Sequence, residues 1–222
     1  MQIALIYPPH TETVSLYQSL IQRAGMDYFD NGLGHSEPLQ NCDAFLLLHP
    51  ERVFELMAAT QLIDVLKQQV ILGKPLLSLG SAAQLLVETG LLPGLENNKP
   101  AIQFAEQIRP PRDAVTFHLI EHYQYNAFTR YLKWPLSVTV ADWAWQFRIP
   151  VGLRMELDIQ GLTLFQDDGQ AVCGLANKAG NVMAILPPIE NTILVDLLFN
   201  SLHEHLKEGY KPHVRPLFYY PR

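Results

Sequence analysis

The sequence contains few cysteines, no long apolar run and no excess of positive charge. Its 222 residues include only Cys42 and Cys173, too few for a disulfide framework, and neither has the neighbouring Cys or His residues of a zinc site. We therefore predict that both are reduced side chains packed in the core. No uninterrupted apolar stretch approaches the roughly 18 residues that a membrane-spanning helix requires, so we expect no membrane association.

The charge balance and the N-terminus exclude further classes of protein. The formal net charge is −6, whereas electrostatic binding of nucleic acid requires a basic face. The first residues, Met1 to Tyr7, lack the basic start and the cleavage site of a signal peptide, so a cytoplasmic protein is expected. With 48% apolar and 17% charged residues the chain is typical of a globular protein, and its length favours a single domain, residues 1–222.

The first half of the chain alternates between short apolar runs and segments with helical spacing of apolar residues. Buried strands are predicted over residues 3–7, 44–48 and 75–79. Helices are predicted over residues 14–24, 53–69 and 82–89. Repeated alternation of this kind is typical of a largely parallel sheet that is covered by helices on both faces.

The second half has closely spaced strands with turn residues between them. These strands are predicted over residues 138–140, 143–149, 162–165, 171–175 and 181–186. A final amphipathic helix begins near Thr192 and ends near Gly209, and a tail rich in proline and aromatic residues follows over residues 211–222. The predicted fold is therefore α/β, with a largely parallel open sheet flanked by helices and an antiparallel extension in the C-terminal half.

The turn at Gly80 carries the first functional signal. Only Gly80 and Ser81 separate the strand at 75–79 from the next helix, and such a turn can expose a nucleophile among backbone N–H donors. In class I glutamine amidotransferases this turn reads Gly-hydrophobic-Cys-x-Gly-x-Gln. The stretch here reads Ser-Leu-Gly-Ser-Ala-Ala-Gln over residues 78–84, so it resembles that motif at Gln84 while Gly80 stands at the cysteine position.

Further motifs narrow the resemblance to the glutaminase subunits of phosphoribosylformylglycinamidine synthase. Gly90-Leu-Leu-Pro-Gly94 is similar to the segment after the turn in that family, and residues 174–190 resemble the strand pair that leads to its Pro-His-Pro-Glu catalytic motif. Histidine is replaced there by Pro188, while Glu190 remains. The resemblance covers nearly the whole chain, is weakest over about 110–160, and implies the flavodoxin-like fold of class I amidotransferases.

Two other loops depart from the family pattern. The Pro-Gly-Gly-Phe turn that supplies oxyanion donors is represented by residues 48–52, where Pro50 lacks an N–H. The glycine-rich loop Pro-x-Ala-His-Gly-Glu-Gly is represented by residues 150–156, which retain little of its polar character. The positions equivalent to the catalytic triad, Gly80, Pro188 and Glu190, therefore hold no intact catalytic set, and we expect no cofactor or metal.

Residues elsewhere offer only weak replacements. Ser78 and Ser81 flank the turn, but neither occupies the cysteine position at 80, and a side chain displaced along the turn points in another direction. Pro188 cannot act as the base for either serine. His118 and His122 could bind a metal on one helix face, although a solvated helical face is favoured because no third ligand is in view. Trp143 and Trp145 lie on the same side of a predicted strand, which indicates core or interface packing rather than stacking on nucleic-acid bases.

Two functions are consistent with these residues. The first is a non-catalytic amidotransferase-like protein that binds a synthetase subunit or a small molecule near Gly80. In the family that synthetase uses ATP and ammonia to make formylglycinamidine ribonucleotide in purine synthesis. The tail at 211–222 either contacts the partner or packs on its own domain. The second is an active enzyme, either the glutaminase itself with a relocated nucleophile or a different reaction that uses Glu190 and His49. The missing cysteine and histidine favour the first.

Overall fold

The protein is described by a computed structural model that covers residues 1–8, 11, 13–32, 37–48, 60–95, 99–107, 112–189 and 193–209. Its strands are β1 (Gln2–Tyr7), β2 (Asp27–Gly32), β3 (Ala44–Leu47), β4 (Leu76–Leu79), β5 (Gln103–Glu106), β6 (Val115–Leu119), β7 (Ser137–Val140), β8 (Trp145–Arg148), β9 (Thr163–Asp167), β10 (Val172–Ala176) and β11 (Val182–Ile185). Its helices are α1 (Val14–Arg23), α3 (Thr60–Ile71), α4 (Ala83–Glu88), α5 (Val151–Ile159) and α6 (Ile193–Glu208), with 3-10 turns η1 (Glu37–Asn41) and η2 (Gly80–Ala82).

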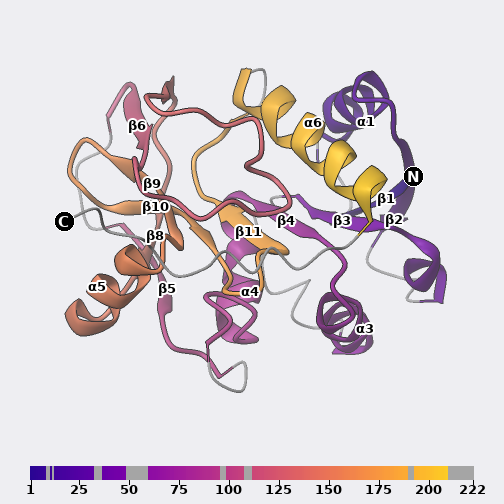
Figure 1. Cartoon of the computed structure of the whole chain (residues 1–222), viewed down its shortest axis with the longest axis horizontal. Helices are drawn as coiled ribbons and strands as arrows, with labels where there is room; N and C mark the ends of the chain where they lie inside the picture. Colours follow the sequence, from indigo (N-terminus) through magenta and orange to yellow (C-terminus); the bar gives the residue numbers. More distant parts are fainter. Residues whose placement is uncertain are drawn as a thin grey trace.

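One large sheet of nine strands runs through the molecule in the order β2-β1-β3-β4-β11-β10-β9-β6-β7. Neighbouring strands from β2 to β11 are parallel, and those from β11 to β7 are antiparallel. Helices α1 and α6 cover one face of the parallel half, while α3 and α4 lie on the other (Figure 1). The predicted α/β fold, with a parallel core and an antiparallel extension, is confirmed.

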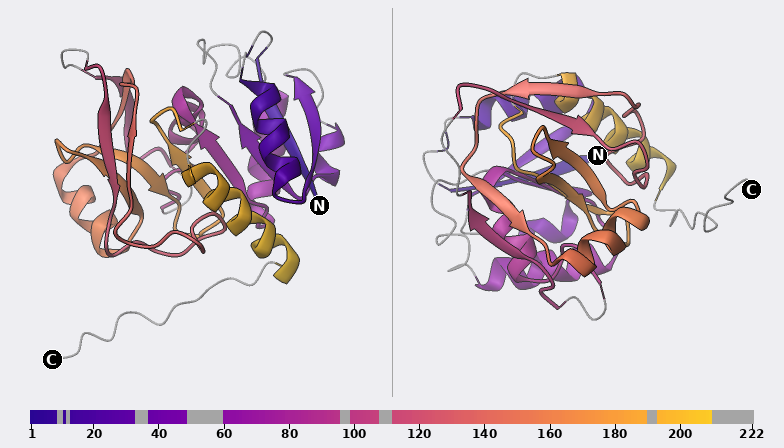
Figure 2. Two further views of the ribbon diagram at one scale, coloured as in Figure 1. Left: turned by 90° about the horizontal axis from the view of Figure 1, so that it is seen from above. Right: turned by 90° about the vertical axis from the view of Figure 1, so that its left-hand side faces the viewer.

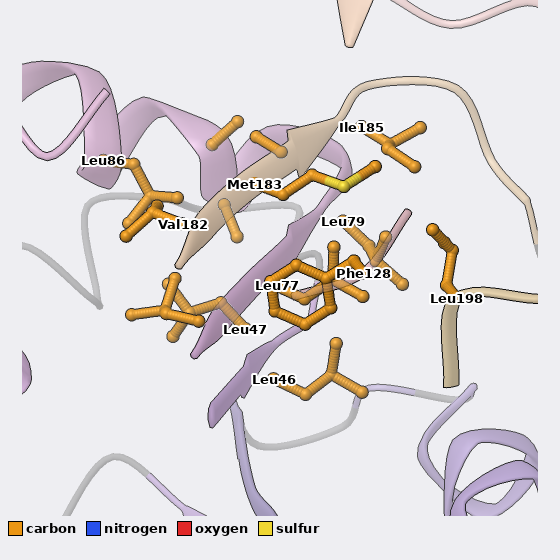
Figure 3. Packing of buried hydrophobic residues seen from close by; sticks show 14 of the residues in the cluster. Leu46, Leu47, Leu77, Leu79, Leu86, Phe128, Val182, Met183, Ile185 and Leu198 are labelled. Atoms are coloured by element: carbon orange, nitrogen blue, oxygen red, sulfur yellow. The ribbon is translucent and has the colours of Figure 1, made fainter. Parts of the chain in front are cut away.

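The central strands are buried on both faces, which explains their continuous apolar sequences. Every residue of β3, β4 and β11 is buried. Leu46, Leu77 and Met183 are in register across these strands and therefore point to the same face. Figure 3 shows this set packed towards Phe128 and towards Leu198 of α6. Their burial fixes the register of the strands whose ends form the site described below.

A second sheet pairs β5 with β8, antiparallel, within the described residues. With the adjoining α5 it lies at the end of the molecule away from β1 and β2 (Figures 1 and 2). The strand predicted over residues 143–149 is observed as β8, Trp145–Arg148. It is shorter than predicted and belongs to this separate sheet. The prediction of a loop over residues 150–156 is wrong, because residues 151–159 form α5.

The predicted helix that carries His118 and His122 is also wrong. His118 lies in β6, whose burial alternates between inward Val115, Phe117 and Leu119 and the more exposed residues between them. His122 lies in the turn that follows the strand. The helix predicted over residues 53–69 is observed from Thr60, and residues 53–59 lie outside the described part of the chain. No helix in the described ranges is both long and apolar enough to cross a membrane.

Candidate functional site

The turn after β4 has the geometry that the sequence predicts. Leu79 is extended, with φ of −117° and ψ of 132°, and the chain then reverses at Gly80, whose φ is +70°. Gly80 is the first residue of the 3-10 turn η2, and helix α4 begins directly after that turn. A left-handed residue between a strand and a helix is the sharp, strained elbow that presents a nucleophile in other enzymes. Glycine adopts this conformation without the cost that a Cβ imposes.

The neighbouring strand brings Pro188 to the same place. β11 runs parallel to β4 with Ile185 opposite Leu79, so the residues that follow both strands emerge at the same edge of the sheet. Gly80 and Pro188 accordingly line one cavity. The structure thus brings together two of the three positions singled out from the sequence, while Glu190 lies outside the described residues.

The segment between β7 and β8 forms another wall of this cavity. The carboxylate of Asp142 accepts hydrogen bonds from the backbone N–H groups of Trp143 and Arg112, both at 2.9 Å. Trp143 is buried and packs edge-to-face on Phe117, with ring centroids 6.4 Å apart. Trp145 stacks on the ring of Phe104 at 5.3 Å. Trp143 and Trp145 both line the cavity, and Trp143 is a core residue while Trp145 is half-buried.

The cavity has a volume of about 250 Å³. Water occupies about 30 Å³ per molecule, so this space corresponds to about eight waters or one small organic molecule. It lies among the ends of β4 and β11, the start of α1 and the β7–β8 segment. The described lining residues are Thr13, Tyr17, Leu79, Gly80, Ser81, Asp142, Trp143, Ala144, Trp145, Leu186, Pro187, Pro188 and Ile189. Proline at 188 therefore does not fill the space beside Gly80.

The lining is mostly apolar and aromatic, with few groups that can move a proton. Asp142 and Tyr17 are its titratable residues in the described part of the chain, and these lining residues include no cysteine, histidine, lysine or arginine. Thioester formation requires a soft nucleophile and a base within hydrogen-bond reach. The described lining offers no thiol, and its one carboxylate, that of Asp142, accepts hydrogen bonds from two backbone N–H groups. It also offers no cationic side chain for the carboxylate of an amino acid.

Neither flanking serine has the setting of a nucleophile. Ser78 is fully buried in β4, and its hydroxyl has no hydrogen-bond partner within the described structure. Strand alternation directs it away from Leu77 and Leu79, to the face that carries α3 and α4. Ser81 lines the cavity but is only 1% exposed. Among the described lining residues no imidazole lies beside it.

Both cysteines are core residues, as predicted. Cys173 lies in β10 and Cys42 follows η1. Burial raises the pKa of the Cys42 thiol, Lys74 opposes this rise, and Asp43 adds to it. A buried thiol with a raised pKa is a poor nucleophile, because the thiolate is the reactive form.

Several lining residues could not be recognised from the sequence. Tyr17 has the helical spacing of an ordinary core residue of α1, and Leu186 and Ile189 continue an apolar strand. Asp142 is the one lining residue that the sequence could have indicated. It is a carboxylate in an otherwise apolar stretch, between a predicted strand and two tryptophans, which is an unusual place for a charged side chain. The segment that contains it was also the part of the chain where the family resemblance was weakest.

Solved structures with this fold include glutamine amidotransferases and a glutaminase domain. A chain in the structure of PurLQS from Thermotoga maritima has a TM-score of 0.68 and 14% identity, with 92% of this chain and 98% of that chain covered. A glutamine amidotransferase from Methylobacillus flagellatus has a TM-score of 0.65 and 8% identity, with 99% of each chain covered. The glutaminase domain of Trypanosoma brucei CTPS has a TM-score of 0.62 and 11% identity, with 96% of each chain covered. No protein-family model matches the chain. The chain has the class I glutamine amidotransferase fold.

Proposed function

We propose that this chain is an amidotransferase-like protein that does not hydrolyse glutamine and that acts by binding a synthetase partner or a small molecule. The observation that carries the proposal is the cavity at Gly80. The backbone at its elbow has a φ of +70°, yet the described lining has no cysteine to act as a thiol nucleophile and no histidine to act as its base. Glutamine hydrolysis depends on both groups. The large sheet, which draws strands from Gln2 to Ile185, supports a single domain for the whole chain.

Ammonia release from glutamine tests the catalytic part of the proposal. The purified chain, alone and with a synthetase subunit, is expected to release no ammonia above the rate of a Ser81→Ala variant, which controls for contaminating glutaminase. A variant with both Cys42→Ala and Cys173→Ala tests whether a relocated thiol acts. Glutamine turnover that follows the chain through purification contradicts the proposal, whether or not it survives these substitutions.

Binding of a small molecule is supported by the open space in the cavity. Its indole, phenol and proline surfaces suit a small apolar or aromatic compound, with the Asp142 carboxylate and hydroxyl groups as polar contacts. A thermal-shift screen with such compounds is expected to find ligands that raise the unfolding temperature. Ala144→Phe, which places a larger side chain on the cavity wall, is expected to abolish the shift. If a compound raises the unfolding temperature of the Ala144→Phe variant as much as that of the unaltered protein, the compound binds outside this cavity.

Binding of a synthetase partner is supported by an apolar ridge on α5. Val151, Met155 and Ile159 are four residues apart, so they form one stripe, and they are 89%, 66% and 67% exposed. Apolar side chains gathered on one exposed helix face are typical of an interaction surface. Co-purification of a large synthetase from native cells tests this part of the proposal.

Substitutions on the ridge make the partner test specific. Met155→Ser is expected to reduce recovery of the synthetase, because it removes apolar area from the centre of the ridge. Ile71→Ser is the matched control, since Ile71 is 70% exposed at the end of α3, far along the chain from the ridge. If Met155→Ser and Ile71→Ser reduce recovery of the synthetase equally, the partner does not bind at α5. Failure to recover any synthetase with the unaltered chain also counts against this part of the proposal.

A further inference from the structure

A hydrogen-bonded Ser-His-Asp set lies on the exposed face of the antiparallel half of the sheet. His118 of β6 is the central residue. Its Nδ1 lies 2.8 Å from Oγ of Ser137 in β7, and its Nε2 lies 2.7 Å from Oδ1 of Asp168, which directly follows β9. The His118 and Asp168 side chains are 44% and 56% exposed, so the group is open to solvent. These residues take no part in the cavity at Gly80.

The sheet register explains why the three side chains meet. His118 is directly opposite Ser137 in the pairing of β6 with β7, and opposite Gln166 in the pairing of β6 with β9. Leu119 N–H donates to the carbonyl of Leu136 at 2.9 Å, which makes the neighbouring His118 and Ser137 a pair without backbone hydrogen bonds. Side chains approach most closely at such pairs.

The chemistry of the three groups sets the direction of their hydrogen bonds. A carboxylate only accepts, so Nε2 of the neutral imidazole carries the proton that is shared with Asp168. Nδ1 then has a free lone pair and accepts the hydroxyl proton of Ser137. The serine is thereby placed against a base, and the base is oriented by a carboxylate, which is the relation that defines a catalytic triad.

A backbone donor is available beside the serine. Because His118 and Ser137 form a pair without backbone hydrogen bonds, the N–H of Ser137 points away from β6. β7 is the last strand in the order of the described sheet, so this N–H faces its free edge. An N–H group next to the nucleophile is suited to stabilise the oxyanion that forms when a carbonyl is attacked.

We propose that Ser137, His118 and Asp168 form a nucleophilic site that hydrolyses small activated esters. Ser137 Oγ bonds to the carbonyl carbon while its proton passes to Nδ1 of His118, and the ester alcohol leaves with that proton. Water then repeats the steps at the acyl-serine, which releases the acid and restores Ser137. Small activated esters are the expected class, because the open site offers few contacts to a larger substrate.

Labelling and turnover test the site together. A fluorophosphonate probe followed by peptide mass spectrometry is expected to place the adduct on Ser137, and p-nitrophenyl acetate is expected to be hydrolysed. Ser137→Ala is expected to abolish the adduct. His118→Asn is expected to lower turnover by about 100-fold, since it removes the general base. Asp168 positions His118, so Asp168→Asn is expected to lower turnover and Asp168→Glu to restore part of it.

The same pair of strands provides the matched control. Thr116 and Thr139 form a similar cross-strand hydroxyl contact at 2.7 Å, two residues along, without an imidazole. Thr139→Ala is expected to leave labelling and turnover unchanged. Circular dichroism checks that each variant is folded. Absence of a Ser137 adduct in the folded protein overturns the proposal, as does an equal adduct yield in His118→Asn.

Discussion

Replacing Gly80 by alanine is expected to destabilise the protein because of the backbone conformation at the elbow. The φ of Gly80 is +70°, and the extended Leu79 before it and the helical Ala82 after it hold the turn in place. In this left-handed region a Cβ lies too close to the following carbonyl oxygen. Gly80→Ala should therefore lower the free energy of unfolding by about 1–2 kcal/mol.

Thermal unfolding followed by circular dichroism measures this change. For a chain of this length, 222 residues, the expected fall in Tm is about 2–8 °C. Gly152→Ala is the matched control, because Gly152 lies in α5 without a positive φ and an added Cβ meets nothing within 4 Å. That substitution should raise the free energy of unfolding by about 0.5–1 kcal/mol, as expected for glycine to alanine in a helix.

A Gly80→Ala variant at least as stable as the unaltered protein refutes the reasoning. A cysteine at this position carries the same backbone strain as alanine. A chain that no longer needs the nucleophile gains stability by placing glycine there. Glycine at position 80 is thus favoured by stability wherever the elbow needs no side chain.

Three further changes test the packing and the buried groups. Asn181→Ala should lower the free energy of unfolding by about 2–4 kcal/mol in urea titrations, because its buried amide donates to the carbonyls of Val70 and Lys74. Gly174→Ala should cost about 1–3 kcal/mol in the same assay, since the new Cβ lies 2.6 Å from the ring of buried Phe165. Because the pKa of Cys42 is raised in the folded protein, the thiol ionises at a lower pH in the unfolded chain than in the folded one. Its contribution to the free energy of unfolding is therefore complete below about pH 8.5 and is lost as the pH rises through the folded pKa. Cys42→Ala should flatten this alkaline decline, and an unchanged decline assigns it to other groups.

The parallel half of the fold could be predicted because its local signals agree. The apolar runs of β1, β3 and β4 end in proline or glycine, and the helices between them have clear apolar stripes. The elbow at Gly80 was placed correctly because only two residues, Gly80 and Ser81, separate the predicted strand from the predicted helix. Its partner Pro188 could be placed only through the resemblance to a known motif, since nothing in the spacing of the two residues indicates that β4 and β11 are neighbours.

The C-terminal half was harder because its signals conflict. His118 and His122 have helical spacing, whereas Val115, Phe117 and Leu119 alternate as in a strand. The strand pattern is the one that the structure follows, because these three apolar side chains are buried on one face of β6. In α5, buried Leu157 and exposed Met155 are both apolar, so no polar face marks the helix. Asp142 and Asp168 form hydrogen bonds with residues far away in the sequence, Arg112 and His118, and a single sequence does not show such contacts.

β11 pairs with β4 on one side and with β10 on the other, although it is the last of the described strands in the chain. The two halves of the large sheet therefore cannot join until residues 182–185 have left the ribosome. Until then the edge of β4 presents unpaired N–H and C=O groups and leucine side chains to its surroundings. Pairing between segments so distant in sequence is slow. The nascent chain is thus expected to depend on chaperones, and truncation before residue 182 should yield aggregates rather than a smaller folded protein.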